Sequence, residues 1–212
     1  MRHAMEWGGL IVAVGALACV ASADQAASGT LMEDAPAVAV PALDLSALAP
    51  GDTVPGFPSW TEGDWEVLRK TVAWARENRV DTLPIGPRIA RIGETFVGTP
   101  YEPATLDPPG PERLVIDLHG FDCVTFVENM VVLAHFVREA PADVLDRPEA
   151  AMTLYQKMLP VVRYRAGRLA GYPSRLHYFT DWLRDNESRG ILDLVTEDLG
   201  GVVDPQPISF MT

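Results

Sequence analysis

The chain has 212 residues, 48% hydrophobic and 22% charged, a composition typical of one globular domain with some additional sequence. It carries 17 basic against 29 acidic side chains, a formal net charge of −12. This balance argues against nucleic acid as a partner, because nucleic-acid binding depends on basic patches that neutralise phosphates.

Residues 1–23 have the pattern of a secretory signal. A basic start precedes an apolar run over residues 8–20, and Ala21-Ser22-Ala23 offers small residues for cleavage. The run is too short to span a bilayer. We therefore expect export to the periplasm or cell envelope, with no transmembrane segment after cleavage. The alternative is a lipoprotein anchored at Cys19, although Ala16 stands where a leucine-like residue is usual.

The rest of the chain divides into a linker and a domain. Residues 24–58 are rich in Ala, Pro, Gly and Asp and lack periodicity, which predicts a disordered linker before a domain over residues 59–212. Apolar spacing and stop signals predict five helices in the domain, over residues 61–79, 87–97, 123–138, 148–159 and 174–186. Pro160 is expected to end the fourth helix before a strand-like segment over residues 161–165, and Gly190 to follow the fifth.

The third helix is the most apolar of the five and is expected to be the buried central one. Its core-facing positions are predicted to be Val124, Val127, Val131 and Ala134. The segment before it, residues 99–120, contains five prolines and a short apolar stretch at 114–118, and it predicts a long shaped loop.

Cys123 is the one cysteine left after signal cleavage, and it stands directly after Gly120-Phe121-Asp122 at the start of the third helix. Unpaired backbone N–H groups and the helix dipole favour a thiolate there, and the same groups suit an oxyanion. Asp122 is expected to cap the helix. The alternative for Cys123 is a small, buried and inert residue.

These residues resemble a known family. Gly98-Thr99-Pro100-Tyr101, a variable loop and then Phe121-Asp122-Cys123 at a helix start resemble the NlpC-type papain-like cell-wall hydrolases. More closely, residues 121–128, 163–165 and 174–182 are similar to the unknown-function family described as N-acetylmuramoyl-L-alanine amidase-like, over roughly residues 85–212. The resemblance implies an α+β papain-like fold, of which the chain holds mainly the helical N-terminal part, with an incomplete sheet.

The resemblance also implies roles for individual residues. Cys123 is the expected nucleophile, Tyr101 lies beside it to bind substrate or hold the tetrahedral intermediate, and Asp122 receives a substrate amine. The alternatives are that Tyr101 only packs in its loop and that Asp122 is only a cap. No metal or organic cofactor is implied, because one mature cysteine and scattered histidines do not make a zinc pattern.

Arg175, His177 and Tyr178, in the last motif, are expected to contact substrate. An arginine fork matches a carboxylate bidentately, and peptidoglycan stem peptides carry carboxylates. The alternative is an arginine and a histidine with ordinary structural roles.

The base is the missing part of the expected site. A cysteine nucleophile of this class needs a histidine base. In the resembled family that histidine comes after the segment at which this chain ends. The chain is therefore expected to stop before its catalytic histidine. His135 lies three helical turns from Cys123, about 18 Å away. His119 and His177 could approach Cys123, but neither matches the family's base.

The sequence thus predicts a hydrolase that cleaves an amide bond in peptidoglycan stem peptides or muropeptides, either between the lactyl group and L-Ala or between D-Glu and the diamino acid. A non-catalytic exported domain that binds wall peptides or a protein is the main alternative. An acyltransferase on the same scaffold is a third. The sequence does not indicate an oligomeric state.

Overall fold

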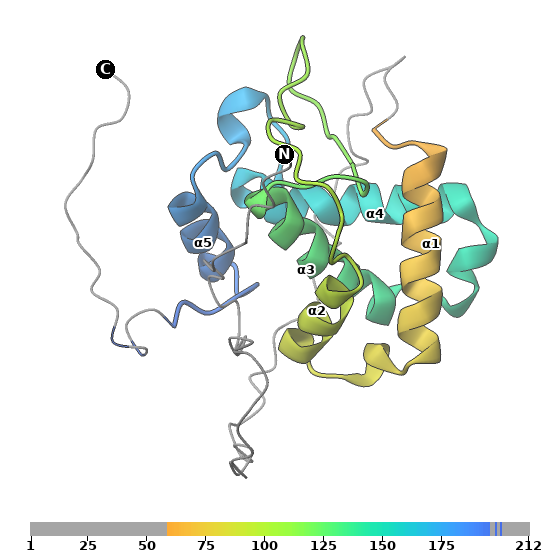
Figure 1. Cartoon of the computed structure of the whole chain (residues 1–212). Helices are drawn as coiled ribbons and strands as arrows, with labels where there is room; N and C mark the ends of the chain where they lie inside the picture. Colours follow the sequence, from red (N-terminus) through yellow and green to blue (C-terminus); the bar gives the residue numbers. More distant parts are fainter. Residues whose placement is uncertain (1–58, 196–197, 199, 201–212) are drawn as a thin grey trace, which may run out of the picture.

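The computed structural model describes residues 59–195, 198 and 200 (Figure 1). The predicted signal peptide and linker lie outside the described residues. Five α-helices are described, with 3₁₀ turns between them: α1 (Glu62–Glu77), α2 (Ile85–Glu94), α3 (Cys123–Glu139), α4 (Pro148–Arg163) and α5 (Phe179–Ser188). Within the described part no helix is long and apolar enough to cross a membrane. No strand forms there either, only two isolated bridges, so the papain-like sheet stays a prediction.

Helix α3 is the central element, as expected. It packs against α1, α2 and α4, and the proline-rich loop (green) rises from the end of the molecule where α3 begins (Figure 1). Val131 and Ala134 are buried as predicted. Val124 and Val127 are only half-buried, because Glu128 and Asn129 take inward positions and find polar partners there.

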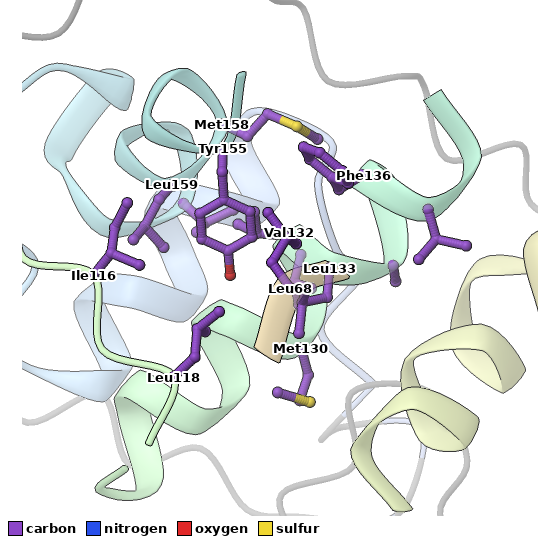
Figure 2. Packing of buried hydrophobic residues seen from close by; sticks show 14 of the residues in the cluster. Leu68, Ile116, Leu118, Met130, Val132, Leu133, Phe136, Tyr155, Met158 and Leu159 are labelled. Carbon is purple, nitrogen blue, oxygen red and sulfur yellow. The ribbon is translucent and has the colours of Figure 1, made fainter. Parts of the chain in front are cut away.

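The core is a layer of aliphatic and aromatic side chains between α3, α4 and α1. In Figure 2 the hydroxyl of Tyr155 points into the cluster around Val132 and Leu68. This hydroxyl donates a 2.8 Å hydrogen bond to Asn129 Oδ1. Burial raises the pKa of Tyr155 well above its ordinary value. The buried asparagine therefore satisfies the one polar atom that Tyr155 brings into the core.

Helix α1 begins with a capping box. Thr61 Oγ1 accepts from the Asp64 amide at 3.2 Å, and Asp64 Oδ2 accepts from the Thr61 amide at 2.7 Å. The other oxygen of Asp64 accepts from the Leu118 amide at 2.8 Å, which ties the end of the proline-rich loop to α1. In the apolar stretch of that loop, Leu114, Ile116 and Leu118 alternate inward and are buried, with half-buried residues between them.

Two predicted helix boundaries are wrong for reasons of tertiary structure. Pro160 does not end α4, which continues to Arg163, so the predicted strand over residues 161–165 is also wrong. The last α4 carbonyls have partners: Val162 O accepts from Asn186 Nδ2 at 3.1 Å, and Val161 O accepts from the Arg189 side chain. These side-chain donors stabilise the last turn of α4, which follows Pro160 and which the proline was expected to exclude from the helix.

The fifth helix begins at Phe179 rather than at residue 174. Tyr164 and Arg175 form an antiparallel bridge, and the Leu176 amide donates to Arg163 O at 3.0 Å, which holds this segment extended. Gly190, with φ of 69°, follows the helix end as predicted. Helix α2 runs over 85–94 rather than 87–97 and keeps Pro87 in its first turn.

Candidate functional site

Cys123 is exposed and is the first residue of α3. The preceding Asp122 is the helix cap: its Oδ1 accepts from the amides of Val124 at 3.0 Å and Thr125 at 2.7 Å. Thr125 Oγ1 returns the bond by accepting from the Asp122 amide at 2.9 Å. The cap therefore occupies two of the helix-start N–H groups that were expected to hold an oxyanion. The N–H of Cys123 is not one of the two.

Tyr101 is held beside the segment that leads into Cys123. The Phe121 amide donates to Pro100 O at 3.2 Å and the Glu102 amide donates to Phe121 O at 3.1 Å, so Tyr101 and Phe121 form a parallel bridge. The Tyr101 side chain is 52% exposed. The bridge thus places the backbone of Tyr101 beside Phe121, two residues before Cys123.

Phe121 anchors this arrangement. Its buried ring meets the rings of Phe96 and Phe126 edge to face, at centroid distances of 5.6 and 5.9 Å. The position of the segment before Cys123 thus depends on apolar packing between the end of α2 and the start of α3.

A buried ion pair lies one to two turns into α3. Arg163 Nε donates to Glu128 Oε2 at 2.7 Å, and both side chains are 1% exposed. Arg163 also donates to the carbonyl of Val115 in the proline-rich loop. Burial raises the pKa of Glu128, while the charge of Arg163 opposes that rise. The pair joins α3, α4 and the proline-rich loop near the start of α3.

Arg175 is buried and engaged by acceptors of the chain itself. It donates to the carbonyl of Leu106 at 2.6 Å, pairs with Asp107, and lies 3.7 Å from Glu112 Oε1. Burial disfavours its charged form, but the bond to Asp107 and the charge of Glu112 outweigh burial and raise the pKa of Arg175. These contacts favour the structural alternative for Arg175, in which it ties the proline-rich loop to the segment after α4.

Tyr164 reinforces this tie. Its hydroxyl donates to Glu112 Oε1 at 2.8 Å, and burial is the main cause that raises its pKa. The buried Glu112 carboxylate therefore accepts a hydrogen bond from the Tyr164 hydroxyl and lies near the positive charge of Arg175.

His177 and Tyr178 lie on the surface next to this network. The ring centroids of His177 and Tyr172 lie 4.2 Å apart, and His177 Nε2 lies 2.9 Å from the Tyr172 carbonyl oxygen. The guanidinium carbon of Arg175 lies 5.2 Å from the centroid of the Tyr172 ring. Tyr172 and Tyr178 are 56% and 43% exposed. Sequence reasoning missed Tyr172, whose one signal was its place in the Gly171-Tyr172-Pro173 turn at the start of the last motif.

No histidine among the described residues hydrogen-bonds the Cys123 thiol. Exposed His119 lies 4.0 Å from Asp64, His135 Nδ1 is 2.8 Å from Glu139 Oε1, and His177 is turned to Tyr172. In the same described part, no group of three or more His, Cys, Asp or Glu side chains is arranged to hold a metal ion.

Comparison with solved structures gives partial matches. A "putative xylanase" from Bacteroides fragilis is 36% identical, with a TM-score of 0.40 over 50% of this chain and 42% of that one. Two structures of an N-acetylmuramoyl-L-alanine amidase from Bacteroides uniformis are 31% and 33% identical, with TM-scores of 0.40 and 0.41. Each covers 48% of this chain, and this chain covers 39% and 40% of them. The chain thus spans less than half the length of these proteins.

No curated protein gives a significant match to the chain. A family model does: residues 91–210, more than half of the chain, match the family described as AmiA-like, N-acetylmuramoyl-L-alanine amidase-like. This range contains Tyr101, Asp122, Cys123 and Arg175. The chain belongs to the AmiA-like, N-acetylmuramoyl-L-alanine amidase-like family.

Proposed function

We propose that this protein hydrolyses an amide bond in the peptide part of peptidoglycan, with Cys123 as nucleophile. The observation that carries the proposal is the exposed thiol at the first residue of the central helix, inside the family match. Partial positive charge at a helix start favours the thiolate, and the buried body of α3 holds it in place. A free cysteine retained only for packing would more commonly be buried.

The reaction follows from this position. The Cys123 thiolate attacks the amide carbonyl carbon, the carbonyl oxygen becomes an oxyanion, and the N–H of Cys123 and the Tyr101 side chain hold it. The C–N bond then breaks, the amine takes a proton from water as it leaves, and a thioester remains on Cys123. Water attacks the thioester, the carboxylic acid product leaves, and the thiol is restored.

The proposal extends to the fold and the location. We assign the domain to the α+β papain-like class of NlpC-type hydrolases, in which the nucleophile begins a central helix. The buried packing of α3 and the extended, alternating stretch at 114–118 support this assignment. An exported protein, in the periplasm or cell envelope, is the location that suits a wall substrate.

The test is hydrolysis of purified muropeptides by the full chain and by Cys123→Ala, with products identified by mass spectrometry. Release of a free stem peptide that begins with L-Ala would assign the lactyl–L-Ala bond, and release of a peptide that begins with the diamino acid would assign the D-Glu bond. We expect Cys123→Ala and iodoacetamide to abolish turnover. Activity that survives both and is lost on chelation would refute the cysteine mechanism in favour of a metal-dependent one.

A second candidate, a non-catalytic domain that binds wall peptides, is favoured by one observation: no described histidine contacts Cys123. Without a base, catalysis is expected to be slower by about two to four orders of magnitude. Added imidazole, a diffusible base, should then raise the rate of the intact chain but not that of Cys123→Ala. Binding without hydrolysis at any imidazole concentration would support the non-catalytic candidate.

A further inference from the structure

A groove of about 550 Å³ lies between α1 and the start of the proline-rich loop. Its apolar walls include Val67 and Trp74 from α1 and Phe96 from the segment after α2. The α1 wall comes from outside the family-matched residues 91–210. Small-molecule and peptide sites are commonly grooves of this size with aromatic walls and few polar groups.

The groove leads to the segment that carries the nucleophile. Pro100, at its edge, accepts the hydrogen bond from the Phe121 amide, and the Phe96 ring packs against that of Phe121, two residues before Cys123. A ligand that fills the groove therefore lies next to the candidate catalytic segment.

The groove lining carries basic side chains in a protein that is acidic as a whole. The whole chain has a net charge of −12, yet the lining formed by described residues includes Lys70 and His119 and no acidic side chain. Asp64, behind His119, already accepts bonds from the amides of Thr61 and Leu118. Among the described residues, Lys70 pairs with Glu66 in an exposed contact at 3.8 Å, which leaves its ammonium able to pair with a ligand.

We propose that this groove is the subsite for the carboxylate-bearing stem peptide, with Lys70 pairing with a peptide carboxylate and Trp74 packing against the peptide's methyl groups. The assignment rests on the proposed function for the identity of the peptide. It also supplies the carboxylate recognition that the sequence led us to expect of Arg175, whose guanidinium is engaged by Asp107 and Glu112.

The chain itself provides the assay, because it contains two lysines, Lys70 and Lys157. Lys157 lies on α4 and is not part of the groove lining. The Cys123→Ala chain is acylated with a lysine reagent in the presence of N-acetyl-L-alanyl-D-glutamate, which has two carboxylates and no amine. Mass spectrometry then gives the acylation rate of each lysine in the same molecule.

We expect Lys70 to be protected and Lys157 to be unchanged. At a probe concentration about ten times the Kd, mass action leaves about one chain in eleven unbound, so Lys70 acylation should slow about tenfold. The diamide of the probe, which lacks both charges, should protect much less. Equal rates at Lys70 with and without the probe would overturn the proposal, as would protection by a neutral disaccharide and not by the peptide.

A matched pair of surface variants tests the ion pair itself. Lys70→Met should weaken binding of the probe about two- to fivefold, the range for one exposed ion pair, and Lys157→Met should leave it unchanged, as measured by calorimetry in the Cys123→Ala chain. Equal affinities for both variants would remove Lys70 from the site. Because neither assay requires turnover, an inactive chain with a protected Lys70 would refute hydrolysis alone, and an active chain with an unprotected Lys70 would refute this subsite alone.

Discussion

The buried pair of Glu128 and Arg163 makes a prediction that can be worked out in numbers. Replacing Arg163 by Met removes the cation that lies 2.7 Å from a carboxylate with 1% exposure. Burial already raises the pKa of Glu128 above its ordinary 4.5, and Arg163 is the main influence that lowers it. In the variant the folded state therefore holds the Glu128 proton more strongly, so stability is fully present below about pH 4.5 and is lost as pH rises.

The size of the loss follows from linkage. Each pH unit between the unfolded pKa and the folded pKa costs about 1.4 kcal/mol. If Glu128 stays protonated in folded Arg163→Met from pH 5 to pH 7, the penalty grows by about 2.7 kcal/mol over that range, just below the 3–5 kcal/mol typical of a broken buried pair. That is a large fraction of the roughly 5–15 kcal/mol that stabilises an ordinary domain.

Urea unfolding of both proteins at pH 5 and pH 7 measures this penalty. The control is the double variant Glu128→Gln with Arg163→Met, in which no titrating carboxylate remains at this position and the extra loss at pH 7 should disappear. A destabilisation of Arg163→Met that is the same at both pH values would show that Glu128 stays solvated in the variant, and the reasoning from burial would be wrong.

Three further predictions concern the site. Cys123 should react with iodoacetamide at pH 6.5 faster in the folded chain than in urea, because the start of α3 favours the thiolate; equal rates by mass spectrometry would contradict that effect. Asp122→Ala should lower the free energy of unfolding by about 1 kcal/mol and Asp122→Asn by much less, since an asparagine can still cap, and matched urea midpoints would argue against a capping role. Arg175→Ala should destabilise the fold by about 2 kcal/mol or more, because it leaves the buried Glu112 carboxylate without its cation, and should weaken binding of free and amidated muropeptides equally. A selective loss for free carboxylates would restore the substrate role of Arg175.

Local signals predicted the elements that depend on local physics. The apolar spacing of α1 and α3 and the glycine after α5 act within one or two turns of the chain, so they can be read in order along it. The position of Cys123 at a helix start was predicted in the same way and is confirmed, and the structure adds that the residue is exposed. Its role as nucleophile stays a prediction.

Long-range partners decided the points on which the sequence was wrong or silent. α4 continues through Pro160 because donors from Asn186 and Arg189 reach its last carbonyls, and the segment before α5 is extended because it bridges to Tyr164. Rules based on local propensity do not include such partners.

By itself the sequence determined the helical framework, the position of Cys123 at the start of the central helix and the family. The tertiary structure alone decided what the charged side chains do. Arg175 could bind a carboxylate through its guanidinium, but it lies buried against Asp107 and Glu112. Lys70 belongs to no predicted motif, yet it lines the groove beside the segment before Cys123. The physical reason is that the role of a charge depends on which partners the fold brings within a few ångströms of it, and the partners of Arg175 lie 63 to 69 residues away in the sequence.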